Sequence, residues 1–149
     1  MAETGLEVFD TTVQKTNRWL KEIREELHLN SRREAYHALR SVLHQLRDRM
    51  TLEELAQFSA QLPMLVRGIL FEGWDPTGKP VRVRHIDEFL QPIQEEFHQM
   101  GLSVNPRQVV QGVFKTLNRH ISRGEVEEVR ALLPQELRAL WPEPSAAEA

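Results

Sequence analysis

The sequence contains one pattern twice, and this repeat constrains the fold more than any single motif does. When the chain is shifted by 71 residues without a gap, identical residues coincide at several positions: Leu46 with Leu117, Ala60 with Ala131, Leu62 with Leu133, Pro63 with Pro134 and Arg67 with Arg138. Upstream, a shift of 70 residues aligns Trp19 with Phe89 and Ile23 with Ile93. A repeat of this length indicates one structural unit that is used twice.

Apolar residues recur at helical spacing along nearly the whole chain. The first repeat has three such stripes: Val13, Thr16, Trp19, Leu20, Ile23 and Leu27; Ala35, Leu39, Val42, Leu43, Leu46 and Met50; and Leu55, Phe58, Leu62, Val66, Ile69 and Leu70. Spacing of this kind is typical of amphipathic helices. The sequence therefore predicts an all-α fold, a six-helix bundle with three helices in each of two tandem repeats, over residues 8–72 and 81–142 of a single domain spanning residues 1–149.

Helix boundaries are marked by capping residues. Ser31 with Glu34, Thr51 with Glu54, and Ser122 with Glu125 have the spacing of a capping box, and Asn105 precedes a proline that suits the first helical position. Asn30 and Gly101 suit the left-handed turn that ends a helix. We expect helices to begin and end at these residues.

Two prolines interrupt the third stripe of each repeat at equivalent places. An interior proline removes a helical hydrogen bond and clashes with the preceding turn. The third helix of each repeat is therefore expected to be kinked or split at Pro63 and Pro134. The last residues, 142–149, have nothing large to bury after Pro142 and are expected to fray.

Composition excludes several classes of function. The chain has 149 residues, a net charge of −3 and a pI near 6.1, which argue against a general nucleic-acid binder. It has no cysteine, so disulfides, thiol catalysis and cysteine-ligated metals are excluded. The N-terminus lacks the pattern of a secretory signal, and no apolar run is long enough to span a membrane. We expect a cytoplasmic protein without a membrane partner.

Three segments together resemble a known family. They are residues 33–49 (REAYHALRSVLHQLRDR), residues 60–68 (AQLPMLVRG) and residues 72–80 (EGWDPTGKP). In combination they are similar to the bacterial family called domain of unknown function 2267, over about residues 5–142. The resemblance implies an all-helical fold and a bacterial source. That family has no assigned activity, so the resemblance implies no catalytic residue and no cofactor.

A Glu-x-x-His motif occurs in both repeats, as Glu25 with His28 and as Glu95 with His98. Such motifs bind iron in carboxylate bundles when both side chains project inward. At about 100° per residue, however, His28 and Glu25 lie roughly 100° and 160° from the buried Leu27. The second copy behaves in the same way around Phe97. We therefore expect both pairs to point outward and expect no metal site.

Basic residues form a strip along one face of the second predicted helix. Its residues are Arg33, His37, Arg40, His44 and Arg47. Helical spacing places them on one face away from Leu39, so the strip is expected to be exposed. It is either a solvated face or a site for an anionic ligand or nucleic acid.

No motif indicates nucleophilic catalysis, since the chain has no Gly-x-Ser-x-Gly sequence and no phosphate-binding loop. The leading expectation is a non-enzymatic helical module that binds a protein partner or itself. Binding of an anion through the basic strip is the alternative, with nucleic acid disfavoured by the acidic charge. A metal-dependent enzyme is the third and weakest reading.

Overall fold

The computed structural model describes residues 4–82 and 85–143. Within these residues the helices are joined by turns and loops, and there is no β-strand. The all-α fold class is therefore confirmed. The eight helices of the described residues are α1 (Glu7–Leu27), α2 (Arg32–Arg47), α3 (Leu52–Ala60), α4 (Met64–Phe71), α5 (Ile86–Gln99), α6 (Pro106–His120), α7 (Arg123–Ala131) and α8 (Gln135–Arg138). The frayed tail expected after Pro142 falls mostly outside the described residues.

The difference between six expected helices and eight observed ones arises at two prolines. Pro63 and Pro134 are the N-cap residues of α4 and α8, with extended ψ angles of 152° and 159°. Proline lacks an amide hydrogen and so cannot continue the hydrogen-bonding ladder of the preceding helix. Each third segment is therefore split at the proline, one of the two outcomes that the sequence predicted. Pro92, in contrast, lies inside an uninterrupted α5.

The predicted helix starts are found, although only one of them is a complete capping box. Thr51 accepts a hydrogen bond from the amide of Glu54, whose carboxylate accepts from the Thr51 amide in return. Ser122 accepts from Glu125, but its own amide donates to Gln61 in the first half of the chain, at 3.1 Å. Asn105 caps α6, with Pro106 at its first position.

The end of α1 corrects one prediction. His28, not Asn30, adopts the left-handed conformation that terminates the helix, with φ of 54°. The backbone amides of His28 and Leu29 donate to carbonyl groups of the last turn, which satisfies two helical acceptors. Gly101 takes the expected left-handed conformation after α5, with φ of 76°.

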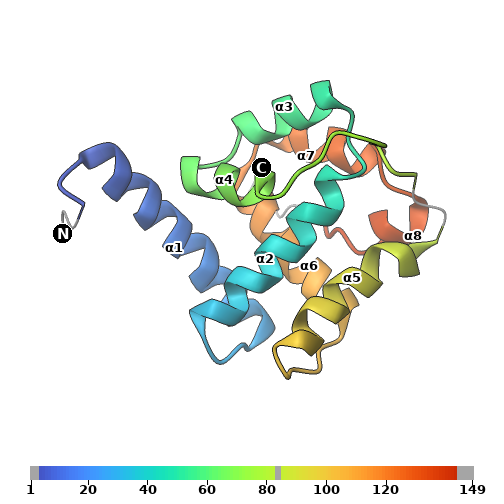
Figure 1. Cartoon of the computed structure of the whole chain (residues 1–149), viewed down its shortest axis with the longest axis horizontal. Helices are drawn as coiled ribbons and strands as arrows, with labels where there is room; N and C mark the ends of the chain where they lie inside the picture. The colour runs from blue at the N-terminus through green and yellow to red at the C-terminus, as the bar shows by residue number, and fades with distance from the viewer. Residues whose placement is uncertain (1–3, 83–84, 144–149) are drawn as a thin grey trace.

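The two halves of the chain share one hydrophobic core. α2 and α6 cross at its centre, and each also packs on the first helix of the other half: α2 on α5, and α6 on α1 (Figure 1). Gly112 of α6 lies so close to Leu27 of α1 that a Cβ atom would come within 2.6 Å of the leucine side chain. The two halves of the chain therefore pack against each other through the helix pairs α2–α5 and α1–α6.

The N-terminal part of α1 extends beyond this core. Residues 7–15, which we call the arm, project from the body on the left of Figure 1. The arm begins where Asp10 accepts hydrogen bonds from the amide and hydroxyl groups of Thr4. The aligned segment of the second half lies before α5, which begins at Ile86, and its described residues, 77–82 and 85, are not helical.

Candidate interaction surface

The predicted basic strip of α2 is not an exposed face. Arg33 is exposed and His37 and Arg40 are half-buried, but His44 and Arg47 are buried, with 9% and 7% of their surface accessible. The prediction that all five residues point into solvent is therefore wrong. The reason is that α4 and the residues that follow it cover the C-terminal half of the strip.

His44 and Arg47 bind the C-terminal end of α4. His44 Nε2 donates to the carbonyl oxygen of Ile69 at 2.8 Å, and Arg47 Nη1 donates to the carbonyl oxygens of Leu70, at 2.9 Å, and Glu72. The last carbonyl groups of a helix have no partner within the helix. Two side chains of α2 thus satisfy the acceptors that α4 leaves open.

Burial also sets the charge of His44. Desolvation lowers the pKa of its imidazole, and the positive charges of Arg47 and Arg40 lower it further, against the raising effect of the Ile69 carbonyl. Both the protonated ring and the neutral ring with its proton on Nε2 can donate to this carbonyl, and the lowered pKa favours the neutral form. His44 therefore acts as a neutral hydrogen-bond donor in this structure.

The middle of the strip forms a salt-bridge network with α5 and the end of α4. His37 Nδ1 lies 2.7 Å from Glu96 Oε2, while Arg40 contacts both Glu96, at 2.9 Å, and Glu72, at 3.0 Å. Burial alone lowers the pKa of the Arg40 guanidinium, but the hydrogen bond to Glu72 and the charge of Glu96 outweigh it, so the pKa is raised. Arg40 is thus paired with carboxylates of the same molecule, and His37 contacts one of them.

In the second half of the chain, the residues that align with Arg47 and His44 also form polar contacts. Asn118, which aligns with Arg47, donates to the carbonyl oxygen of Pro142 at 2.8 Å and accepts from the indole of Trp141. Lys115, which aligns with His44, forms a salt bridge to Glu26 of α1. The contacts of α2 with α5 are thus mirrored by contacts of α6 with α1.

The Glu-x-x-His pairs lie where the sequence placed them. Glu25, His28, Glu95 and His98 are all exposed, so neither pair projects into the core. In residues 4–82 and 85–143, no group of three or more histidine and carboxylate side chains could hold a metal ion. The structure does not bring these residues together as a candidate metal centre.

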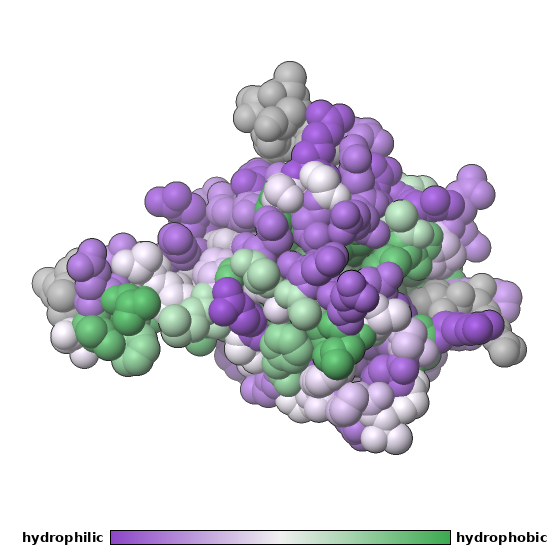
Figure 2. Space-filling model, turned by 90° about the horizontal axis from the view of Figure 1, so that it is seen from above, coloured by the Kyte–Doolittle hydropathy of each residue, from purple (hydrophilic) through white to green (hydrophobic). Residues whose placement is uncertain are grey.

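The arm of α1 carries an apolar surface that the sequence analysis missed. Leu6, Val8 and Phe9 are about half exposed, at 49%, 49% and 48%, and Val13, which we expected in the buried stripe, is 37% exposed. Met64 and Leu65 of α4 are exposed nearby, and the Leu65 amide donates to Thr12 at 2.9 Å. Figure 2 shows hydrophobic residues gathered on the projecting end of the molecule. We call these six residues, from Leu6 to Leu65, the arm surface.

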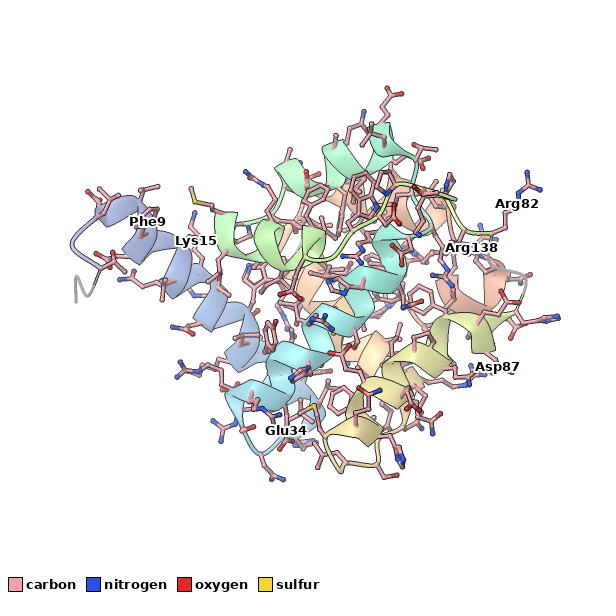
Figure 3. The ribbon with its side chains drawn as sticks, viewed as in Figure 1. Phe9, Lys15, Glu34, Arg82, Asp87 and Arg138 are labelled. Atoms are coloured by element: carbon pink, nitrogen blue, oxygen red, sulfur yellow. The ribbon has the colours of Figure 1, made fainter. Side chains whose placement is uncertain are left out.

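A groove separates one side of the arm from α4. It has a volume of about 660 Å³ and is lined from the arm by Glu7, Val8, Thr11, Thr12 and Lys15, and from the other side by Leu62, Pro63, Met64 and Arg67. Figure 3 labels Phe9 and Lys15 on this projecting part of α1. The Arg67 guanidinium is fixed at the groove wall by hydrogen bonds to the carbonyl oxygens of Ser59 and Leu62. The groove thus has one wall of packed structure and one wall formed by the arm.

A second groove, of about 770 Å³, lies on the outer face of α1. Arg18, Lys21, Arg24 and Arg32 line it, with Glu25 as its one carboxylate. Arg24 is bound to the carbonyl oxygens of Leu29 and Asn30, and Arg32 to Asn17. Within the described residues Arg18 and Lys21 form no ion pair. Three of the four cations that line this groove thus come from α1, and the fourth, Arg32, is the first residue of α2.

The described residues thus form an all-helical protein. Residues 16–140 match the model of the family described as uncharacterized conserved protein (DUF2267), and the chain belongs to this family. The match begins at Thr16, so the arm precedes it. No curated protein matches the chain.

The described part of the chain has no helix that is both long and apolar enough to cross a membrane. The bacterial source and the cytoplasmic location stay predictions.

Proposed function

We propose that the protein is a non-enzymatic helical module that binds a protein partner, or itself, through the arm surface. The observation that supports this proposal is the group of half-exposed apolar side chains on a helix that projects from the body. Monomeric proteins rarely leave large contiguous apolar patches in water, and such patches mark interaction sites. The pattern also fits helix-mediated recognition, in which residues at helical spacing enter a partner's surface.

The apolar stripe of α1 supports the same proposal. Thr16, Trp19, Leu20 and Ile23 are buried in the core, and Val13, Phe9 and Leu6 continue this stripe at spacings of three and four residues. Within the described residues the core ends before the stripe does. A partner that covers the arm surface would extend the packing that already buries the rest of α1.

We also propose that the two halves arose as a tandem repeat. The proline N-caps of α4 and α8, the hydroxyl caps at Thr51 and Ser122, and the carbonyl contacts of Arg47 and Asn118 support this reading. The arm falls within the predicted first repeat, but the aligned residues that the structure describes, 77–82 and 85, are not helical.

Site-specific photo-crosslinking tests the function. A photoreactive phenylalanine analogue replaces Phe9 in one variant and Gln91, an exposed residue of α5, in a control variant, and both are irradiated in cells. The proposal predicts a crosslinked protein from position 9 and none from position 91. Absence of any adduct at position 9, or equal adducts at both positions, would contradict it.

Binding of an anionic ligand is the second candidate function. The cationic groove on α1, with Arg18 and Lys21 unpaired in the described residues, favours it. The α2 strip supports it less, because His37, Arg40, His44 and Arg47 all have partners inside the molecule. The acidic net charge disfavours nucleic acid as that ligand.

A further inference from the structure

The arm wall of the groove has oppositely charged ends, while the opposite wall carries one cation, Arg67. Glu7, Thr11 and Lys15 follow one another at intervals of four residues, so they lie along one face of the helix, and all three line the groove. The acidic residue is at the start of the arm and the basic residue two turns later, with the threonine midway. All three are exposed, and Glu7 and Lys15 form no ion pair within the described residues.

If a second copy of this helix lies antiparallel to the first, each glutamate faces a lysine of the other copy. We propose that the groove binds the arm of a second copy of this chain, antiparallel to the first, about a twofold axis at Thr11. This inference goes beyond the proposed function, because Thr11 and Phe9 are two residues apart and therefore lie on roughly opposite faces of the helix. In this orientation Glu7 of each copy faces Lys15 of the other, which gives two equivalent charge pairs. A parallel pair would instead place Glu7 against Glu7 and Lys15 against Lys15.

The side chains between the charged ends are compatible with close approach of two helices. Val8, Thr11 and Thr12 are small or β-branched, and Met64 of α4 is 49% exposed at the groove wall. A second arm in the groove would bury Val8 and Met64, which otherwise face water. A twofold contact uses the same surface on both copies, and twofold dimers are the commonest soluble oligomers.

Charge reversal tests this pairing by sedimentation velocity. The unmodified protein is expected to associate with rising concentration toward twice the 17.4 kDa chain mass. Glu7→Lys and Lys15→Glu should each weaken the dimer roughly tenfold, because each turns two attractive contacts into repulsive ones. The double variant Glu7→Lys/Lys15→Glu should dimerise again. An equimolar mixture of the two single variants should also dimerise, since both of its charge pairs are attractive.

Two matched reversals serve as controls. Glu53→Lys changes an exposed glutamate in the first turn of α3, and Lys21→Glu changes an exposed lysine of α1 outside the groove. Neither should alter the dimer, and thermal melting should verify that every variant folds.

The possible outcomes distinguish failure of the homodimer from failure of the proposed function. If the protein sediments as a monomer at all concentrations but crosslinks to a different protein at position 9, the proposed homodimer is wrong. The proposed function, binding of a protein partner through the arm surface, would then still stand. A dimer that the single reversals leave unchanged overturns the antiparallel register. Absence of both association and crosslinking removes the proposed function as well.

Discussion

At the scale of single residues, four cationic or imidazole side chains of α2 serve the fold. His37 and Arg40 contact the carboxylate of Glu96, while His44 and Arg47 supply hydrogen bonds to carbonyl groups at the end of α4. A buried carbonyl without a donor costs about 1–3 kcal/mol, which is comparable to a large fraction of a domain's net stability. These side chains therefore contribute through the acceptors that they satisfy more than through their charge.

The protonation of His44 is predicted to make the protein less stable in acid. Its pKa in the folded state is lowered from the ordinary value of 6.5, so the unfolded chain takes up the proton first as the pH falls. The stabilisation associated with the neutral ring is complete above the unfolded value and is lost as the pH falls below about 6.5 toward the lowered folded value. Urea unfolding between pH 7 and pH 5 should show a smaller decrease in stability for His44→Gln than for the unmodified protein.

His28→Gln is the control for this measurement, because His28 is exposed. It should retain the acid sensitivity of the unmodified protein. If His44→Gln loses stability over the same pH range as fully as His28→Gln does, the burial of His44 is not what makes the protein sensitive to acid.

Helical spacing could predict which residues of α2 share a face but not what covers that face. The strip lies away from Leu39 as expected, yet α4 returns over its C-terminal half after the chain breaks at Pro63. The sequence showed the proline but not the direction in which the next helix would leave. Helical spacing therefore could not predict that His44 and Arg47 are buried.

At the scale of helices, short α4 depends on donors from outside itself. A helix of eight residues has as many unsatisfied terminal groups as a long one, and short helices are marginal in water without tertiary contacts. Pro63 begins α4 without a side-chain cap, while His44 and Arg47 complete its far end. The capping residues Thr51, Asn105 and Ser122 could be read from the sequence because they act on neighbouring amides. The α4 contacts could not, because they join residues more than twenty positions apart.

Replacing Arg47 by methionine is predicted to destabilise the protein. Methionine keeps much of the side-chain volume but leaves the carbonyl groups of Leu70 and Glu72 without their donor. The expected loss is about 1.5–3 kcal/mol in the free energy of unfolding, measured in urea. Arg33→Met on the exposed start of the same helix should change stability by only about 0.5 kcal/mol or less. Equal effects of the two substitutions would show that the α4 contacts contribute nothing.

At the scale of the whole molecule, the N-terminal and C-terminal halves of the chain share one hydrophobic core, and the arm projects from this body. The charged contacts between the halves are reciprocal: His37 and Arg40 of α2 meet Glu96 of α5, and Lys115 and His120 of α6 meet Glu26 and Glu22 of α1. The repeated stripes predicted the helices that make this core. They also placed Val13 inside it, because periodicity continues along a helix beyond the point where its neighbours stop.

The central claim, that copies of the chain meet through the arm, can be tested by amide hydrogen exchange at two protein concentrations. We expect amides of residues 7–15 to exchange more slowly at high protein concentration, where the arm is covered, and amides of α3 and α7 to exchange at the same rate at both concentrations. Exchange in the arm that does not depend on concentration, or protection that appears on α3 and α7 instead, would contradict pairing through the arm.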